Sequence, residues 1–193
     1  NNMPHIKLSI DTFRSLVVLK ASETYGEFII NDISAGEDDE NMLRIAGNLG
    51  FTYIAMHKRG TPLDMQTKCD YNDVVEDIHD YFVRFLVKAE KAGIHSLIID
   101  PGFGFSKNSD QNYLLLNGLK RLQLYRDFQK IPILVGLSRK SMIYRLLGTS
   151  PEEVLGATMA LNLTALLNGA VIIRVHDVKE GVECVKLFLK INS

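Results

Sequence analysis

Polar side chains follow several apolar runs of this sequence at the point where each run ends. Asp11, Asn31 and Asp100 each come directly after such a run. An ionised carboxylate accepts two parallel hydrogen bonds and Asn both donates and accepts, so these residue types suit a planar heterocycle carrying N–H donors and ring-nitrogen acceptors. Any one of them alone could be a helix N-cap or a turn former. All three in the same position relative to a strand favour a binding site.

Hydroxyls and cations gather after the apolar run ILVGL. Ser138, Arg139, Lys140 and Ser141 follow it and lead into the helical sequence SMIYRLLG. Such side chains beside the free N–H groups of a helix start bind phosphate or another anion. This reading is favoured over the alternative, a solvated basic turn.

Arg174 and His176 interrupt the last apolar run, VIIRVHDV, where an uncompensated charge would be costly to bury. Residues two apart on a strand face the same side, so the pair suits a leaving pyrophosphate. The alternative is a structural ion pair between Arg174 and a neighbouring carboxylate.

Other residues at strand ends could shape the same pocket. Met56 and Phe105 could line it, although such residues are usually core, and Gly136 would let a ring approach the backbone. Lys58 and Arg59, in the sequence MHKRG, are interpreted as a solvated loop.

Six strand candidates alternate with helical patterns along the chain. The strands are expected at 6–11, 27–32, 51–56, 96–100, 132–137 and 170–175, and the helical stretches at 12–26, 38–50, 72–93, 111–128 and 150–169. Several strands are nearly continuous apolar runs, which indicates a parallel sheet buried on both faces. Ser150 and Glu153 form a capping box with Pro151 at the first helical position.

This alternation permits an open doubly wound sheet or a (β/α)₈ barrel. No GxGxxG follows the first strand, and charged residues occur at or just past five of the six strand ends, where a barrel has its active site. We therefore predict an α/β fold, a TIM barrel with about six of its eight βα units in this chain.

Composition limits the class of protein. The 193 residues are 46% hydrophobic with a net charge of −1, which predicts one domain over 1–193 and argues against nucleic acid or an anionic membrane as a partner. Cys69 and Cys184 are too few for a disulfide framework, and no apolar run approaches the length of a membrane span, so a cytoplasmic location is expected. Three histidines lack metal-ligand spacing: His5, His79 and His95.

Motifs distributed along most of the chain resemble the dihydropteroate synthases, from about residue 6 to the C-terminus. They are, in order, SIDT, INDIS, MHKRGTPLDMQ, DPGFGFSKNSDQN, GLSRKS and RVHDV. The resemblance implies a barrel enzyme of folate biosynthesis, a transferase and sulfonamide target. Such an enzyme joins p-aminobenzoate to 6-hydroxymethyl-7,8-dihydropterin pyrophosphate and releases pyrophosphate with the assistance of Mg²⁺.

The resemblance also implies the roles of individual residues. The pterin ring would be held by Asp11, Asn31, Asp100 and Lys140, in a slot shaped by Met56, Phe105 and Gly136. The p-aminobenzoate site would be bordered by Lys140 and Ser141. The pyrophosphate would be held by Arg174 and His176, which together with Lys140 would be the catalytic residues.

The family's first two strands have no counterpart here, and with them are missing a loop Asn that binds Mg²⁺ and a Gly-rich loop containing an Arg. We therefore expect an N-terminally incomplete portion, which has no metal ligand of its own, is inactive alone and is homodimeric when complete. A corrinoid methyltransferase that binds methyltetrahydrofolate and a non-catalytic pterin-binding module remain alternatives. Lys140, Arg174 and His176 favour the synthase over the methyltransferase, which needs no pyrophosphate clamp.

Overall fold

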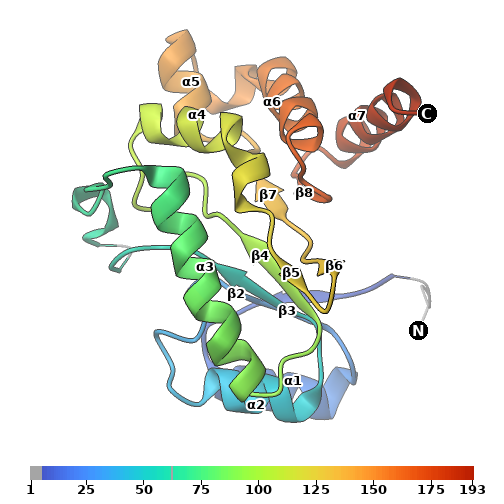
Figure 1. The fold of residues 1–193 in the computed structure, drawn as a ribbon. Helices are drawn as coiled ribbons and strands as arrows, with labels where there is room; N and C mark the ends of the chain where they lie inside the picture. The colour runs from blue at the N-terminus through green and yellow to red at the C-terminus, as the bar shows by residue number, and fades with distance from the viewer. Residues whose placement is uncertain (1–5, 62) are drawn as a thin grey trace. The chain divides into compact units, whose positions relative to one another are not determined.

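The computed structural model describes residues 6–61 and 63–193, which form two compact units. The first unit extends to residue 57 and includes residues 81–99, and the second comprises residues 58–80 and 100–193. Each unit is built around parallel strands followed by helices (Figure 1). Among the described residues, no helix combines the length and apolar character needed to cross a membrane.

The first unit contains a four-stranded sheet in the order β1-β2-β3-β4. Its strands are β1 (Ser9–Asp11), β2 (Ile29–Asp32), β3 (Tyr53–Met56) and β4 (Leu97–Asp100), the last residue of which belongs to the second unit. β2 pairs in parallel with both β1 and β3. Every residue of β3 is buried, as a sheet covered on both faces requires.

Helices α1 (Ser15–Tyr25) and α2 (Met42–Leu49) follow β1 and β2, and α3 (Val74–Lys91) leads toward β4. Gly47 in α2 is a point of close approach. A Cβ atom added there would lie 1.6 Å from the carbonyl oxygen of Ala92, so only glycine lets the helix pack against the segment that follows α3.

In the second unit, β7 (Leu134–Gly136) pairs in parallel with β8 (Ile172–Arg174). Among the described residues of this unit, η1 (Met65–Thr67), the N-terminal part of α3, α4 (Ser109–Asn117) and η2 (Leu119–Leu122) precede β7 in the sequence. Between β7 and β8 lie α5 (Ser141–Leu147), the 3₁₀ turn η3 (Pro151–Glu153) and α6 (Leu155–Leu167), and α7 (Val178–Ile191) follows β8. α6 packs against α7 (Figure 1).

All six expected strands are present, each shorter than its apolar run. The helical stretch expected at 111–128 is right only in its first part, since α4 ends at Asn117 and only a 3₁₀ turn follows, at Leu119–Leu122. Gly118, between them, packs against Val75, whose side chain lies 2.7 Å from where a Cβ atom would be. The chain then forms a hairpin of β5 (Tyr125–Arg126) and β6 (Gln129–Lys130). Its two turn residues, 127 and 128, have φ of 48° and 65°, the positive values that favoured hairpin turns require.

The capping box predicted at the start of 150–169 is confirmed. The Ser150 N–H donates to the Glu153 carboxylate at 3.2 Å, and the Glu153 side chain also accepts from the Ser150 hydroxyl. The box caps the N-terminus of the 3₁₀ turn η3 and not that of the α-helix, which begins at Leu155.

We expect Gly47→Ala to lower the free energy of unfolding by about 2 kcal/mol or more, because the added methyl group overlaps a backbone carbonyl that cannot rotate away. The matched control is Gly156→Ala in α6, where no described atom lies within 4 Å of the place that the methyl group would take, so that helix propensity should leave stability equal or higher. Urea unfolding of both variants measures the contrast, and equal stabilities would contradict it.

Candidate functional site

Two predicted binding residues meet at the strand ends of the first unit. Asp11 and Asn31 are register partners on β1 and β2, and the Asn31 side-chain amide donates to the Asp11 carboxylate. Asn31 is buried and Asp11 is exposed, so the pair presents a carboxylate whose orientation is fixed by a buried amide. Met56, the last residue of β3, is buried.

The neighbouring Asp32 is a buried carboxylate that the sequence analysis missed. One of its oxygens accepts from the Ser34 N–H at 2.8 Å and the Ser34 hydroxyl at 2.7 Å, and the other accepts from the Gly36 N–H at 2.8 Å and the Tyr53 hydroxyl at 2.5 Å. Burial and then the negative Asp32 raise the pKa of Tyr53. Asp32 therefore fixes the loop after β2, and the Asp-x-Ser turn signal in INDIS could have indicated it.

Asp100 begins the loop that follows β4, and one of its carboxylate oxygens accepts from the Gly102 N–H at 2.8 Å. Burial raises the pKa of Asp100, and this effect is opposed by the Gly102 bond and by the charges of Lys140, Lys107 and Arg174. A carboxylate at this strand end thus faces a group of cations within the second unit. These cations favour the ionised form of the carboxylate, which accepts hydrogen bonds from the N–H donors of a ligand.

Lys140 lies across the same loop. Its ammonium donates to the carbonyl oxygen of Phe103 at 2.6 Å and stands 4.8 Å from the ring centroid of Phe105. Gly104 leaves room for it, since a Cβ atom there would lie 3.0 Å from the lysine side chain. Burial lowers the pKa of Lys140, while the nearby Asp100 raises it.

Lys107 is a second lysine of this loop and carries no role in the sequence analysis. Its side chain is buried, and its ammonium donates to the carbonyl oxygens of Gly102 and Phe105, each at 2.9 Å. Burial lowers its pKa to about 7, against the opposing charge of Asp100. Composition and spacing gave no signal for Lys107, because a lysine in a polar loop normally points into solvent.

Gly136 and Arg174 are the last register partners of β7 and β8. A Cβ atom added to Gly136 would lie 3.8 Å from the Arg174 Cβ, an ordinary contact, so the described protein does not itself require glycine there. Ser141 is the first residue of α5, half-buried, one residue after Lys140.

The prediction that Arg174 and His176 face the same side of one strand is wrong. β8 ends at Arg174, so His176 lies beyond the strand and the two-residue alternation does not extend to it. Both residues are exposed, which removes the cost of a buried charge from the argument. The His176 N–H instead donates to the Ser138 hydroxyl at 3.2 Å, which joins the loop after β8 to the loop after β7.

Two of the other basic residues differ from their interpretation. Arg139 forms an ion pair with Asp177 at 2.8 Å, so its guanidinium is bound within the protein instead of serving as an anion site. The interpretation of Lys58 and Arg59 as a solvated loop is wrong: Lys58 is buried, and Arg59 stacks 3.8 Å from the Tyr71 ring centroid.

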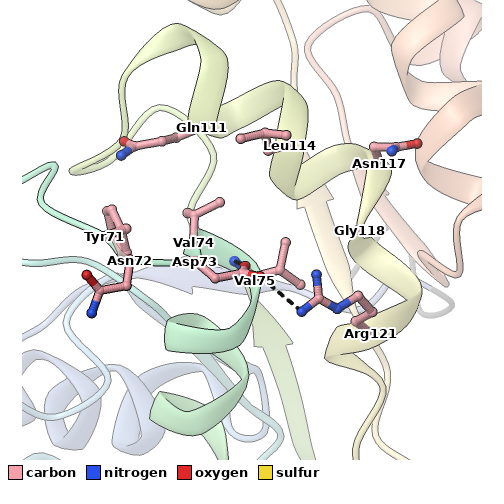
Figure 2. Close-up of a pocket in the computed structure, with 10 residues that line it drawn as sticks. All are labelled: Tyr71, Asn72, Asp73, Val74, Val75, Gln111, Leu114, Asn117, Gly118 and Arg121. Carbon is pink, nitrogen blue, oxygen red and sulfur yellow. Dashed lines mark hydrogen bonds and ion pairs between the residues drawn. The ribbon is translucent and has the colours of Figure 1, made fainter.

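A cavity of about 550 Å³ lies elsewhere in the second unit (Figure 2). It opens between the start of α3 and the α4–η2 segment, and its lining includes Tyr71, Gln111 and Leu114. At its edge, Arg121 is paired with Asp73 at 3.1 Å. None of its lining residues is among the predicted site residues, so the cavity is separate from the chemistry at the strand ends. Across the described part of the chain, no cluster of three or more His, Cys, Asp or Glu side chains could hold a metal ion.

Comparison with known proteins identifies the family. The model of the family described as "Pterin binding enzyme" matches residues 1–176. The chain therefore belongs to the pterin binding enzyme family, as the motifs predicted.

Among curated relatives, the dihydropteroate synthase of Escherichia coli is 41% identical over 182 residues, which are 93% of this chain and 62% of the relative. A bifunctional dihydropteroate synthase/dihydropteroate reductase of Helicobacter pylori is 37% identical, over 97% of this chain and 48% of the relative. The chain thus spans less than two thirds of the length of these relatives.

Solved structures agree. The Stenotrophomonas maltophilia dihydropteroate synthase with active site-bound imidazole is 36% identical with a TM-score of 0.89, over 100% of this chain and 71% of that one. The Burkholderia cenocepacia enzyme complexed with 7,8-dihydropteroate is 35% identical with a TM-score of 0.88, over 97% and 68%. The expected fold class, α/β of the TIM barrel type, is confirmed.

Lys107→Met should change how stability depends on pH. Because the folded protein loses the Lys107 proton near pH 7 and the unfolded chain keeps it to about pH 10.5, the unfolded state binds more protons between these values, and wild-type stability should rise with pH there. The rise is at most about 1.4 kcal/mol per pH unit, and the variant should lack it.

Urea unfolding of both proteins at pH 7, 8 and 9 measures this difference. Lys140, whose pKa is also lowered by burial, is present in both proteins. Parallel pH profiles would contradict the prediction.

Proposed function

We propose that this chain provides the pterin- and pyrophosphate-binding part of a dihydropteroate synthase. The reaction joins the amine of p-aminobenzoate to the methylene carbon of 6-hydroxymethyl-7,8-dihydropterin pyrophosphate and releases pyrophosphate, a transferase step of folate biosynthesis. The observation that carries the proposal is the Asp100 carboxylate facing Lys140 beside the Phe105 ring, together with identity to named synthases. Relatives of this name are also known in complex with 4-aminobenzoic acid and with sulfonamide drugs.

In the proposed complex, Asp100 and Lys140 hold the pterin ring of the substrate, with Asp11 and Asn31 as further contacts. Met56, Phe105 and Gly136 shape the slot for the flat ring. An ionised Asp100 accepts hydrogen bonds from ring N–H groups, and Lys140 donates to ring acceptors. Ser141 and Lys140 border the p-aminobenzoate site.

The proposed mechanism is dissociative. The bond between the methylene carbon and the pyrophosphate oxygen breaks first, and both electrons leave with the pyrophosphate. The amine nitrogen then forms the new bond and loses a proton. Asp100 stabilises the pterin as it becomes positive, and Arg174 and His176 stabilise the oxygen that becomes negative. The proposed catalytic residues are Lys140, Arg174 and His176.

Mg²⁺ is proposed as the cofactor, where it would neutralise charge on the leaving pyrophosphate. Among the described residues, no cluster of three or more His, Cys, Asp or Glu side chains could hold this ion. We also propose that residues 1–193 act as one pterin-binding domain of a cytoplasmic protein. Neither Cys69 nor Cys184 forms a disulfide bond. Neither nucleic acid nor a membrane is proposed as a partner.

A homodimer is proposed as well. It is supported by an apolar groove of about 450 Å³ between α6 and α7, lined by residues that include Met159, Leu163 and Leu187. Leu187 is 61% exposed and lies beside the other apolar side chains of this groove, and a contiguous exposed apolar surface of this kind marks an interaction site.

Substitutions of Asp100 and Arg174 should affect differently the binding of the pterin ring and of the pyrophosphate group. Asp100→Asn should weaken binding of 6-hydroxymethyl-7,8-dihydropterin and of its pyrophosphate alike, because both carry the ring. Arg174→Ala should weaken the pyrophosphate form much more than the unphosphorylated form, which loses only the effect of this charge on Asp100. Titration calorimetry with the two ligands measures this contrast.

In the full-length protein with Mg²⁺, each substitution should lower the rate of dihydropteroate formation about 10²-fold or more, because one charge-assisted contact in the transition state is worth about 2–4 kcal/mol. Wild-type kinetics in both variants would contradict the proposed function.

Leu187→Glu should convert the proposed dimer to a monomer, since a charge would be buried at the contact. The control is Leu114→Glu on α4, a leucine 59% exposed, which should leave the dimer intact. Sedimentation velocity distinguishes the outcomes, and a wild-type monomer or a dimeric Leu187 variant would refute this contact.

A further inference from the structure

We propose that Arg139 and Asp177 are a positioning pair that fixes the loop after β8 against the loop after β7 and so places Arg174 and His176 for the pyrophosphate group. This inference rests on the proposed function and adds residues to which no role in the reaction has been given. Neither residue is proposed to touch the substrate.

The pair is geometrically specific. The Arg139 Nε donates to one oxygen of the Asp177 carboxylate at 3.1 Å, and Nη2 donates to the other at 2.8 Å. A two-point contact between a planar guanidinium and a planar carboxylate fixes both the distance and the orientation of the two groups. A single-point contact through a lysine could not fix the orientation.

The remaining arm of Arg139 ties the pair to the scaffold. Its Nη1 donates to the carbonyl oxygens of Pro151 and Glu152, each at 3.1 Å. These carbonyls belong to η3, which the Ser150 capping box closes. The Arg139 backbone N–H also donates to the buried Thr158 hydroxyl at 3.3 Å, so the arginine is held from three directions.

The pair continues the alignment of β7 and β8 beyond the end of their ladder. The last register partners are Gly136 and Arg174. The next connection is the His176 N–H to the Ser138 hydroxyl, and the one after it is Arg139 to Asp177. Side chains thus take over from backbone pairing where the chain must leave the sheet and turn toward the proposed ligand.

Two further features distinguish this pair from an incidental surface ion pair. Asp177 is the N-cap residue of α7, yet among the described contacts its side chain makes no capping bond and is committed to Arg139. Arg139 has a φ of 53°, a conformation that costs a non-glycine residue of the order of 1 kcal/mol or more and persists only where its surroundings hold it.

The charges of the Arg139–Asp177 pair and the separate anchoring of Lys140 also support this role. The Arg139 guanidinium lowers the pKa of Asp177, and Asp177 raises that of Arg139, so both stay ionised near neutral pH. Lys140 is anchored separately on the Phe103 carbonyl. Breaking the pair should therefore release Arg174 and His176 while contacts to the pterin ring persist.

The experiment is a double-mutant cycle of Arg139→Met, Asp177→Asn and the double variant. The protein is titrated calorimetrically with 6-hydroxymethyl-7,8-dihydropterin and, separately, with its pyrophosphate. Each single variant should bind the pyrophosphate form about tenfold more weakly or worse, as expected when contact groups shift by a fraction of an ångström, and bind the unphosphorylated form within about twofold of wild type. The double variant should be no weaker than the worse single variant, because both break one unit.

Arg139→Lys keeps the charge without the two-point contact, so it should behave like Arg139→Met. The matched control is Arg121→Met, which breaks an ion pair with Asp73 and Glu76 in the same unit and should leave both affinities unchanged. This control separates loss of position from loss of any surface salt bridge.

Wild-type affinity for the pyrophosphate form in all Arg139 and Asp177 variants would overturn the inference, as would an equal loss for both ligands. These outcomes leave the proposed function standing, provided that wild-type protein binds the pyrophosphate form. Wild-type protein that binds neither ligand would contradict the proposed function, and this inference with it.

Discussion

The cost of placing a carboxylate at the half-buried end of β4 is the constraint on which the loops of the second unit depend. Burial raises the pKa of Asp100 and so opposes the ionised form, which is the form that accepts paired hydrogen bonds from a ring. The protein offsets this cost with the Gly102 N–H and with the positive charges of Lys140, Lys107 and Arg174. The conformation of the loop that follows β4 holds two of those cations in place.

Cations near a buried carboxylate must themselves be satisfied. Lys107 and Lys140 are held by backbone carbonyls of the loop that carries Asp100, at Gly102, Phe103 and Phe105. The loop can turn its carbonyls toward them because residues 102 and 104 have positive φ, which glycine adopts without strain. Burial in turn lowers the pKa of both lysines, so carboxylate and cations form one electrostatic group.

Arginine is used differently. Arg139 and Arg59 are each engaged within the protein, by Asp177 and by Tyr71 with Asp77, and each orders a loop after a strand. The planar, permanently charged guanidinium suits this because it makes several directed bonds at once. In GLSRKS, Arg139 is therefore held by Asp177 while its neighbour Lys140 contacts the loop that follows β4.

The six strands, the capping box at Ser150, the fold class and the family could be predicted from the sequence, because these depend on local periodicity and on residue order along the chain. The proximity of Asp11 and Asn31 also follows from the sequence, since adjacent parallel strands bring their ends to one edge. Which polar residues face inward became clear from the three-dimensional structure. It showed Lys107 buried on loop carbonyls, Arg139 committed to Asp177 and a chain reversal where a long helix was expected, because burial and pairing depend on neighbours distant in sequence.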